Sequence, residues 1–180
     1  MLYSYEACKE TFGSDYQVKK AVMEGKLFQI EKGIYSEKEY ISELQVIIFK
    51  YPKAVFTMNS AFYYHGMTDV IPDHYYLQTW RGSSKIKDSR VCQLFENSLD
   101  GELGKSEIVY NGTSIPIYDK ERMFVELVRG KKKLPFDYYK EIINYYRNVV
   151  DQLDLQKIQE YAHALPKTNL IMETLRLEVL

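Results

Sequence analysis

The sequence predicts an α+β fold, in which a truncated winged helix-turn-helix precedes a small antiparallel sheet and a C-terminal helical bundle. Residues 14–36 combine a helical pattern with two short β-prone runs, the order of a helix followed by its wing. Residues 74–118 are rich in β-branched and aromatic side chains, and from Asp119 onward the apolar residues recur at helical spacing. We therefore expect two domains, 1–36 and 37–180.

Capping signals predict the helix-turn-helix. Ser4–Thr11 can form a first helix, and the Phe-Gly pair that follows it is the expected turn. Ser14 and Gln17 have the spacing of a capping box, and Gly25 ends the second helix at a position that favours a left-handed residue. The apolar residues expected on the inner face of this second helix are Val18, Ala21 and Val22.

The wing is predicted from Leu27–Ile30 and Ile34–Ser36, two β-prone runs joined through a turn at residues 31–33. In a winged helix the second helix of the helix-turn-helix lies in the major groove, and exposed side chains contact bases and phosphates. The residues expected to contact DNA are therefore the outward ones of this helix and the lysines that follow it: Tyr16, Gln17, Lys19, Lys20, Lys26 and Lys32.

The remaining elements follow in order. Ser36 and Glu39 have the spacing of a second capping box, which predicts a linking helix that ends at Pro52, and Thr57 can cap a short helix that Gly66 ends. Strands are expected over 74–80, 91–96 and 107–118, the last with a hairpin turn at its Asn-Gly pair. Four helices are expected after Asp119, which is the predicted cap of the first.

Three stretches of the chain carry a family resemblance: EGKLFQIEKGIY at 24–35, MNSAFYYHGM at 58–67, and IPIYDKERMFVELVR at 115–129. In their order and spacing they resemble the AbiEi family, the antitoxins of bacterial type IV toxin–antitoxin systems. Members of that family carry a further helix before the helix-turn-helix, whereas only Met1–Tyr3 precede it here. The resemblance therefore implies a shortened winged helix over 1–36 and an AbiEi-like antitoxin domain over 37–180.

By that resemblance the protein would be a transcriptional regulator of viral defence (abortive infection) that represses its own operon through the winged helix. Its C-terminal domain would counter a nucleotidyltransferase toxin, directly or indirectly. The implied partners are operator DNA, the cognate toxin and a second copy of the chain on an inverted repeat. The alternative, from another class, is a protein-interaction or regulatory module that has lost DNA binding.

The charge balance indicates weak DNA binding at most. The formal net charge is −1, and residues 1–50 hold seven lysines against eight acidic residues. No long-range field therefore attracts the protein to nucleic acid, and any binding must come from a few lysines. Two basic tracts are expected to be solvated loops or, alternatively, a surface for nucleic acid or an acidic partner: Arg81, Lys85, Lys87 and Arg90, and then Lys131, Lys132 and Lys133.

The sequence predicts no catalytic residue, metal or cofactor. His65 precedes a glycine at a helix end, and with Asp73 and His74 it forms no HxxxH or HExxH pair. A nuclease would need carboxylates such as Asp119, Glu121 and Glu126, but the first is a natural cap and Glu121 a first-turn partner of Arg122. No serine elbow, P-loop or glycine-rich nucleotide fingerprint is present. We therefore expect a protein that is not an enzyme.

The cysteines and the hydropathy suggest where the protein acts. Cys8 and Cys92 are distant in sequence and form no CxxC, which fits a reducing compartment. No apolar run is long enough to span a membrane, and no signal peptide is evident. We expect a cytoplasmic protein without a membrane partner.

Overall fold

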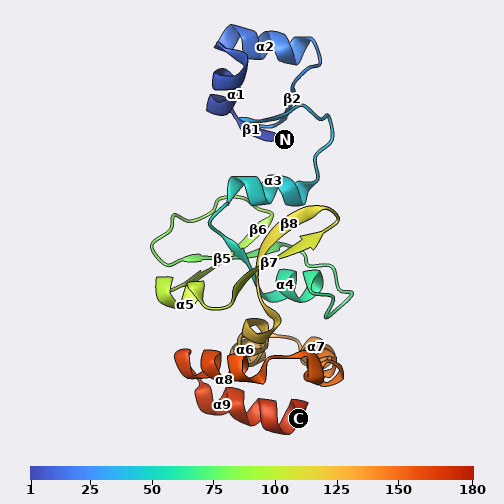
Figure 1. Ribbon diagram of the computed structural model, residues 1–180, viewed down its shortest axis with the longest axis vertical. Helices are drawn as coiled ribbons and strands as arrows, with labels where there is room; N and C mark the ends of the chain where they lie inside the picture. Colours follow the sequence, from blue (N-terminus) through green and yellow to red (C-terminus); the bar gives the residue numbers. More distant parts are fainter. The chain divides into compact units, whose positions relative to one another are not determined.

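The computed structural model describes residues 1–180, except for the side chain of Ser98, and about 49% of these residues are helical and 20% lie in strands. The fold is α+β, with a small antiparallel sheet and a mixed sheet. The described chain divides into two compact units, Met1–Pro52 and Lys53–Leu180, and Figure 1 labels most of their helices and strands. The boundary therefore follows Pro52, whereas the sequence placed it after residue 36.

The first unit is built from short elements around an antiparallel sheet. Along the chain they are β1 (Leu2–Ser4), α1 (Tyr5–Phe12), α2 (Asp15–Met23), β2 (Phe28–Glu31), β3 (Ile34–Ser36) and α3 (Glu43–Lys50). The strand order is β1-β3-β2, with Leu2 and Phe28 both opposite Ser36. The expected hairpin of β2 and β3 is present, and β1 is a strand that the sequence did not predict.

Serine side chains begin the helices of the first unit. The Ser4 hydroxyl accepts a hydrogen bond from the Ala7 amide (3.2 Å), and Ser14 accepts from the Gln17 amide (3.4 Å). The linking helix α3 begins later than predicted, because Ser42 is its cap and accepts from Gln45 (3.4 Å). Ser36 instead binds the Lys38 amide (2.9 Å), which holds a turn after β3.

The core of the helix-turn-helix region is small. Its buried side chains are Cys8, Val18, Ala21 and Leu27, with Tyr3, Tyr5, Phe12 and Tyr35 packed against them. Val18 and Ala21 thus face inward as predicted, but Val22 is 37% exposed, so that part of the prediction was wrong. The reason is that so small a core covers only a narrow stripe of α2, and Val22 lies beside that stripe.

The second unit contains a sheet in the order β6-β5-β4-β8-β7. Its strands are β4 (Val55–Phe56), β5 (Tyr75–Trp80), β6 (Val91–Glu96), β7 (Lys105–Tyr110) and β8 (Thr113–Tyr118). The Asn111-Gly112 turn joins β7 and β8 as a hairpin, as predicted, with positive φ at both residues (48° and 76°).

This sheet is mixed, and the prediction of an antiparallel sheet here was wrong. β5 and β6 run parallel, as do β4 and β8. The connection over residues 81–90 returns to the start of β5, and Gln93 on β6 holds it by accepting from the Ile86 amide (2.8 Å) and donating to the Ser84 carbonyl (3.1 Å). A tight turn would have made the two strands antiparallel, whereas this longer return makes them parallel.

Helices complete the second unit: α4 (Met58–Tyr64), α5 (Ser98–Glu102), α6 (Lys120–Gly130), α7 (Phe136–Asn148), α8 (Leu155–Ala164) and α9 (Thr168–Thr174). Figure 1 shows α6 to α9 gathered beside the sheet as a bundle, which confirms the predicted helical C-terminus. Asp119 caps α6, as predicted, by accepting from the Arg122 amide (2.8 Å). The bundle core includes Phe124, Ile142, Tyr146, Ile158 and Ile171, all buried.

Candidate functional site

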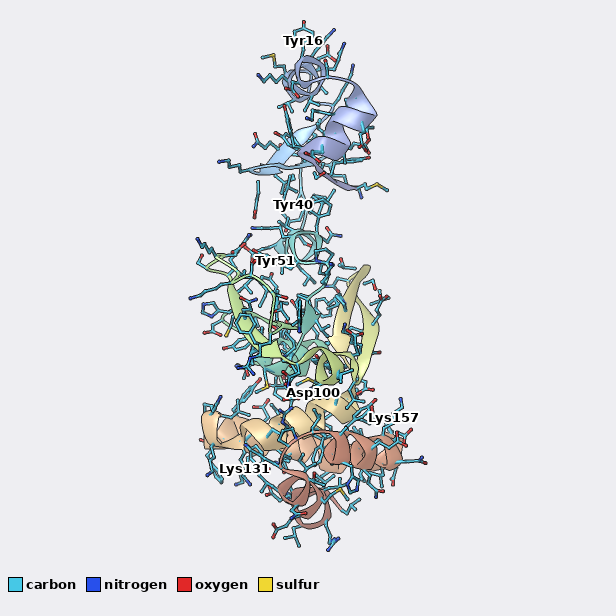
Figure 2. All side chains as sticks on the ribbon, turned by 90° about the vertical axis from the view of Figure 1, so that its left-hand side faces the viewer. Tyr16, Tyr40, Tyr51, Asp100, Lys131 and Lys157 are labelled. Carbon is cyan, nitrogen blue, oxygen red and sulfur yellow. The ribbon has the colours of Figure 1, made fainter. Side chains whose placement is uncertain are left out.

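The outer surface of α2 carries the residues predicted to contact DNA. Tyr16, Gln17, Lys19 and Lys20 are all exposed, and Figure 2 shows Tyr16 projecting from this helix. The backbone of Gln17, and not its side chain, serves the cap at Ser14. Among the described residues the Gln17 amide has no hydrogen-bond partner, so both of its polar atoms are available to a ligand.

Glu24 offsets part of the positive charge on this surface. Its carboxylate lies 3.8 Å from Lys20 Nζ and 2.7 Å from Lys26 Nζ. Lys19 and Lys32 make no ion pair in the described part of the chain, and Lys32 lies at the turn between β2 and β3. The cations that are free for phosphate are therefore fewer than the sequence suggested.

The same surface also carries apolar side chains. Tyr16 and Met23 on α2 are 71% and 87% exposed, and Tyr40, which follows the wing, is also exposed. A shallow groove of about 480 Å³ lies between the end of α2, strand β2 and residues 39–41. Apolar exposure of this kind suits a protein partner.

The predicted basic tracts of the second unit are partly neutralised. Arg90 binds Asp88 through Nε (2.9 Å) and Nη2 (2.8 Å). Lys131 binds Glu178 (2.8 Å) and lies over the ring of Tyr139. The cations of these tracts that are exposed and make no ion pair among the described residues are Arg81, Lys85, Lys87, Lys132 and Lys133.

His65 joins α4 to the end of β8. Its Nε2 lies 2.7 Å from the Tyr118 carbonyl oxygen and donates to it in the neutral imidazole. Burial lowers the pKa of His65 below its ordinary value, which favours this neutral form. His74 pairs with Asp73 (3.0 Å), and no group of three or more His, Cys, Asp or Glu side chains that could hold a metal occurs among the described residues.

A pH dependence of stability follows from His65. Because its pKa is lower in the folded protein than in the unfolded chain, the unfolded chain binds the proton first as the pH falls. The contribution of His65 to the unfolding free energy is therefore fully present above the unfolded pKa of about 6.5. It decreases as the pH falls through the folded pKa. We expect His65→Gln to flatten the fall in unfolding free energy between pH 7 and 5 (roughly the range of His titration).

Urea unfolding, followed by the fluorescence of Trp80, measures this dependence. Trp80 is the single tryptophan and lies in the second unit, so its emission reports on that unit. An identical pH dependence in the wild type and in His65→Gln would contradict the expectation.

The acidic residues weighed for nuclease chemistry each hold a different part of the fold. Asp119 caps α6 and also accepts from the Tyr161 hydroxyl (2.9 Å), and burial raises its pKa. Glu121 accepts from the Asp154 amide (3.0 Å) at the start of α8. Glu126 pairs with Arg122 (2.8 Å). The carboxylates are thus committed to structural contacts.

Arg122 forms a buried network that the sequence analysis missed. We expected it to pair with Glu121, but its guanidinium binds Glu126 (2.8 Å) and Glu96 (3.5 Å). It also donates to the carbonyls of Asp100 (2.8 Å) and Leu103 (3.3 Å) and lies over the ring of Tyr118. Figure 2 shows Asp100 between the sheet and the C-terminal helices, where Arg122 joins them. The i, i+4 spacing of Arg122 and Glu126 was the available signal.

The second unit also contains a cavity of about 600 Å³, which nothing in the sequence indicated. It lies at the end of β5, between α5, the end of β8 and residues 82–84. The side chains of Gln78, Trp80, Lys53 and Lys105 line it, together with Tyr118.

No family model matches the chain, and no curated protein matches it. In the part of the chain that the structure describes, no helix has both the length and the apolar character needed to cross a membrane.

Proposed function

We propose that the protein is a DNA-binding regulator with antitoxin activity, similar to the AbiEi family, and that its first unit is a winged helix. The observation that carries the proposal is the topology of that unit. A strand, two helices and a hairpin follow one another, and the first strand pairs beside the second strand of the hairpin, in the order β1-β3-β2. Those elements match the two helices of the helix-turn-helix and the three-stranded sheet of a winged helix.

In this proposal α2 is the recognition helix. Gln17 offers an amide that can pair with an adenine edge in the major groove, and Lys19 and Lys20 lie beside it for phosphates. Lys32 at the wing tip and Lys26 before β2 reach the flanking backbone. Contacts to phosphate set the position of the protein on DNA, and Gln17 supplies the sequence preference.

The second unit is proposed to counter a nucleotidyltransferase toxin. The resemblance supports this role through residues 58–67 and 115–129, which are far apart in sequence. In the structure they contact each other, because His65 of the first stretch binds the carbonyl of Tyr118 in the second. The two stretches therefore contribute to one folded unit, as parts of a common domain would.

A protein-interaction module is the second candidate. The exposed Tyr16 and Met23, and the pairing of Lys20 and Lys26 with Glu24, favour it. In that case α2 would bind an apolar surface of another protein, and DNA binding would be absent.

Co-expression tests the proposed function. The chain is expressed with each gene that flanks its own, and growth is scored. We expect one flanking gene to inhibit growth alone and the chain to restore growth. The variant Lys19→Ala/Lys20→Ala should restore growth equally, because both lysines lie in the first unit, but should fail to repress a reporter under the chain's own promoter. Absence of rescue by a folded, well-expressed chain would contradict the antitoxin role.

A further inference from the structure

The cavity of the second unit has the size of a small-molecule site. Its volume of about 600 Å³ lies within the usual range for ligand pockets. Gln78 and Trp80 alternate with Thr79 along β5 and therefore extend from the same face of the sheet. The residues that line this cavity all belong to the second unit, so the proposed winged helix takes no part in it.

Trp80 presents a ring that is supported on one face. A Cβ atom at Gly82 would lie 2.7 Å from Cη2 and 2.9 Å from both Cζ2 and Cζ3 of the indole. Such similar distances to three adjacent atoms mean an approach onto the face of the ring, since an edge-on approach would leave Cζ2 and Cζ3 much farther away. The Gly82 backbone thus covers one face. Because Trp80 is 60% exposed, it retains surface on which a planar ligand can stack.

Gln78 supplies polar groups without a protein partner. Its side chain is 8% exposed and lines the cavity, and its amide makes no hydrogen bond among the described residues. Among the described residues only the Tyr138 hydroxyl is fully buried without a hydrogen-bond partner, so the Gln78 amide is open to the cavity, where water or a ligand can bind it. Its carbonyl and NH₂ groups provide an acceptor and donors side by side, the arrangement that pairs with the edge of a nucleobase.

The charges at the cavity favour an anion beside the base. Lys53 is exposed and has no ion pair among the described residues, whereas Lys105 binds Glu102. The Tyr118 hydroxyl is already used, because it donates to the Gly101 carbonyl (3.0 Å). Lys53 is therefore the cation that is free to bind a phosphate group.

We infer that this cavity binds a nucleotide, with its base stacked on Trp80, the base edge hydrogen-bonded to Gln78, and its phosphate at Lys53. The same chemistry occurs in a free mononucleotide and in a nucleotide of single-stranded RNA or DNA, where stacking on aromatic rings is also used. Adenine is the base that glutamine pairs with most readily through adjacent donor and acceptor atoms.

Titration of the full chain with AMP tests the inference. Trp80 is the single tryptophan, so stacking of adenine should quench the intrinsic fluorescence and do so saturably. N-acetyltryptophanamide provides the correction for collisional quenching. Gln78→Met and Lys53→Ala should each weaken AMP binding by about five- to tenfold, as expected for the loss of one or two hydrogen bonds or one charged contact. Lys140→Ala, an exposed lysine outside the cavity, should leave the affinity unchanged.

Saturable quenching that both variants weaken supports the site. If Gln78→Met unfolds at or above the thermal unfolding temperature of the wild type, its weaker AMP binding is not caused by loss of the fold. Lys53→Ala replaces an exposed side chain, so it should leave the fold intact. Its effect on AMP binding therefore tests the site even if Gln78→Met is destabilised. An oligoadenylate that binds at least tenfold tighter than AMP identifies a single strand as the source, and equal binding identifies the free nucleotide. Absence of saturation at millimolar AMP, unchanged binding in both variants, or equal binding of ribose 5-phosphate would overturn the inference.

Discussion

We expect Arg122→Met to lower the unfolding free energy of the second unit by about 3–5 kcal/mol, the range typical of breaking a buried ion pair. The substituted side chain is 1% exposed. Methionine fills much of the same volume, so the loss comes from the charge and the hydrogen bonds and not from a cavity.

The contacts of Arg122 explain the size of the expected loss in unfolding free energy. Its removal leaves Glu96 and Glu126 half-buried with Arg129 as their remaining cation, at 3.4 and 2.7 Å. It also removes the donor from the carbonyls of Asp100, in α5, and of Leu103, the residue after α5. Two largely buried carboxylates that share one remaining cation, and carbonyls left without donors, are both strongly unfavourable.

Urea unfolding followed by Trp80 fluorescence measures the effect. Arg176→Met is the matched control, since Arg176 is exposed, and it should change the stability by no more than about 0.5 kcal/mol. Arg122→Met/Glu126→Leu should recover part of the loss, because the double variant leaves Arg129 with one carboxylate to neutralise and not two. A loss below about 1 kcal/mol in Arg122→Met would contradict the role given to the network.

The local signals of the sequence were sufficient for most helices and for both hairpins. Ser14 and Asp119 cap helices as their spacing predicts, and the Asn111-Gly112 turn joins two antiparallel strands. These features depend on neighbouring residues, so a local pattern can show them.

Features that depend on distant residues could not be predicted in the same way. The parallel pairing of β5 and β6 depends on how Gln93 holds residues 84–86, and β1 is a strand because Leu2–Ser4 pairs with β3. Arg122 becomes buried only because α5 places two carbonyls over α6. The cavity arises from residues of several elements, so it has no sequence motif.

The second large effect is expected at α2. We expect Lys19→Ala/Lys20→Ala to make the slope of log affinity for DNA against log salt shallower by about 2, since each phosphate contact contributes about −0.9. Wild type should show a slope of about −2 to −3 per protomer, because Lys19 and Lys32 make no ion pair among the described residues and Lys20 is only loosely paired with Glu24 (3.8 Å). The small number of available cations predicts low affinity, and because that affinity would come from phosphate contacts, it should decrease as the salt concentration rises.

Glu24→Gln, at the C-terminal end of α2, is the matched variant and should change DNA binding in the opposite direction. Its carboxylate pairs with Lys20 and Lys26, so its neutralisation frees both for phosphate. We expect tighter DNA binding and a steeper salt slope. Lys132→Ala/Lys133→Ala, two exposed lysines of the second unit, is the control for a general loss of positive charge and should leave the slope unchanged.

The most direct test of the proposed regulator is a binding titration on a labelled fragment of the chain's own promoter at about 50 and 200 mM salt, a range over which phosphate contacts have a large effect. The proposal predicts that wild type binds, that Lys19→Ala/Lys20→Ala binds more weakly with a shallower slope, and that Glu24→Gln binds more tightly. If the lysine variant binds as well as wild type with an unchanged slope, α2 is not a recognition helix and the proposed function is contradicted.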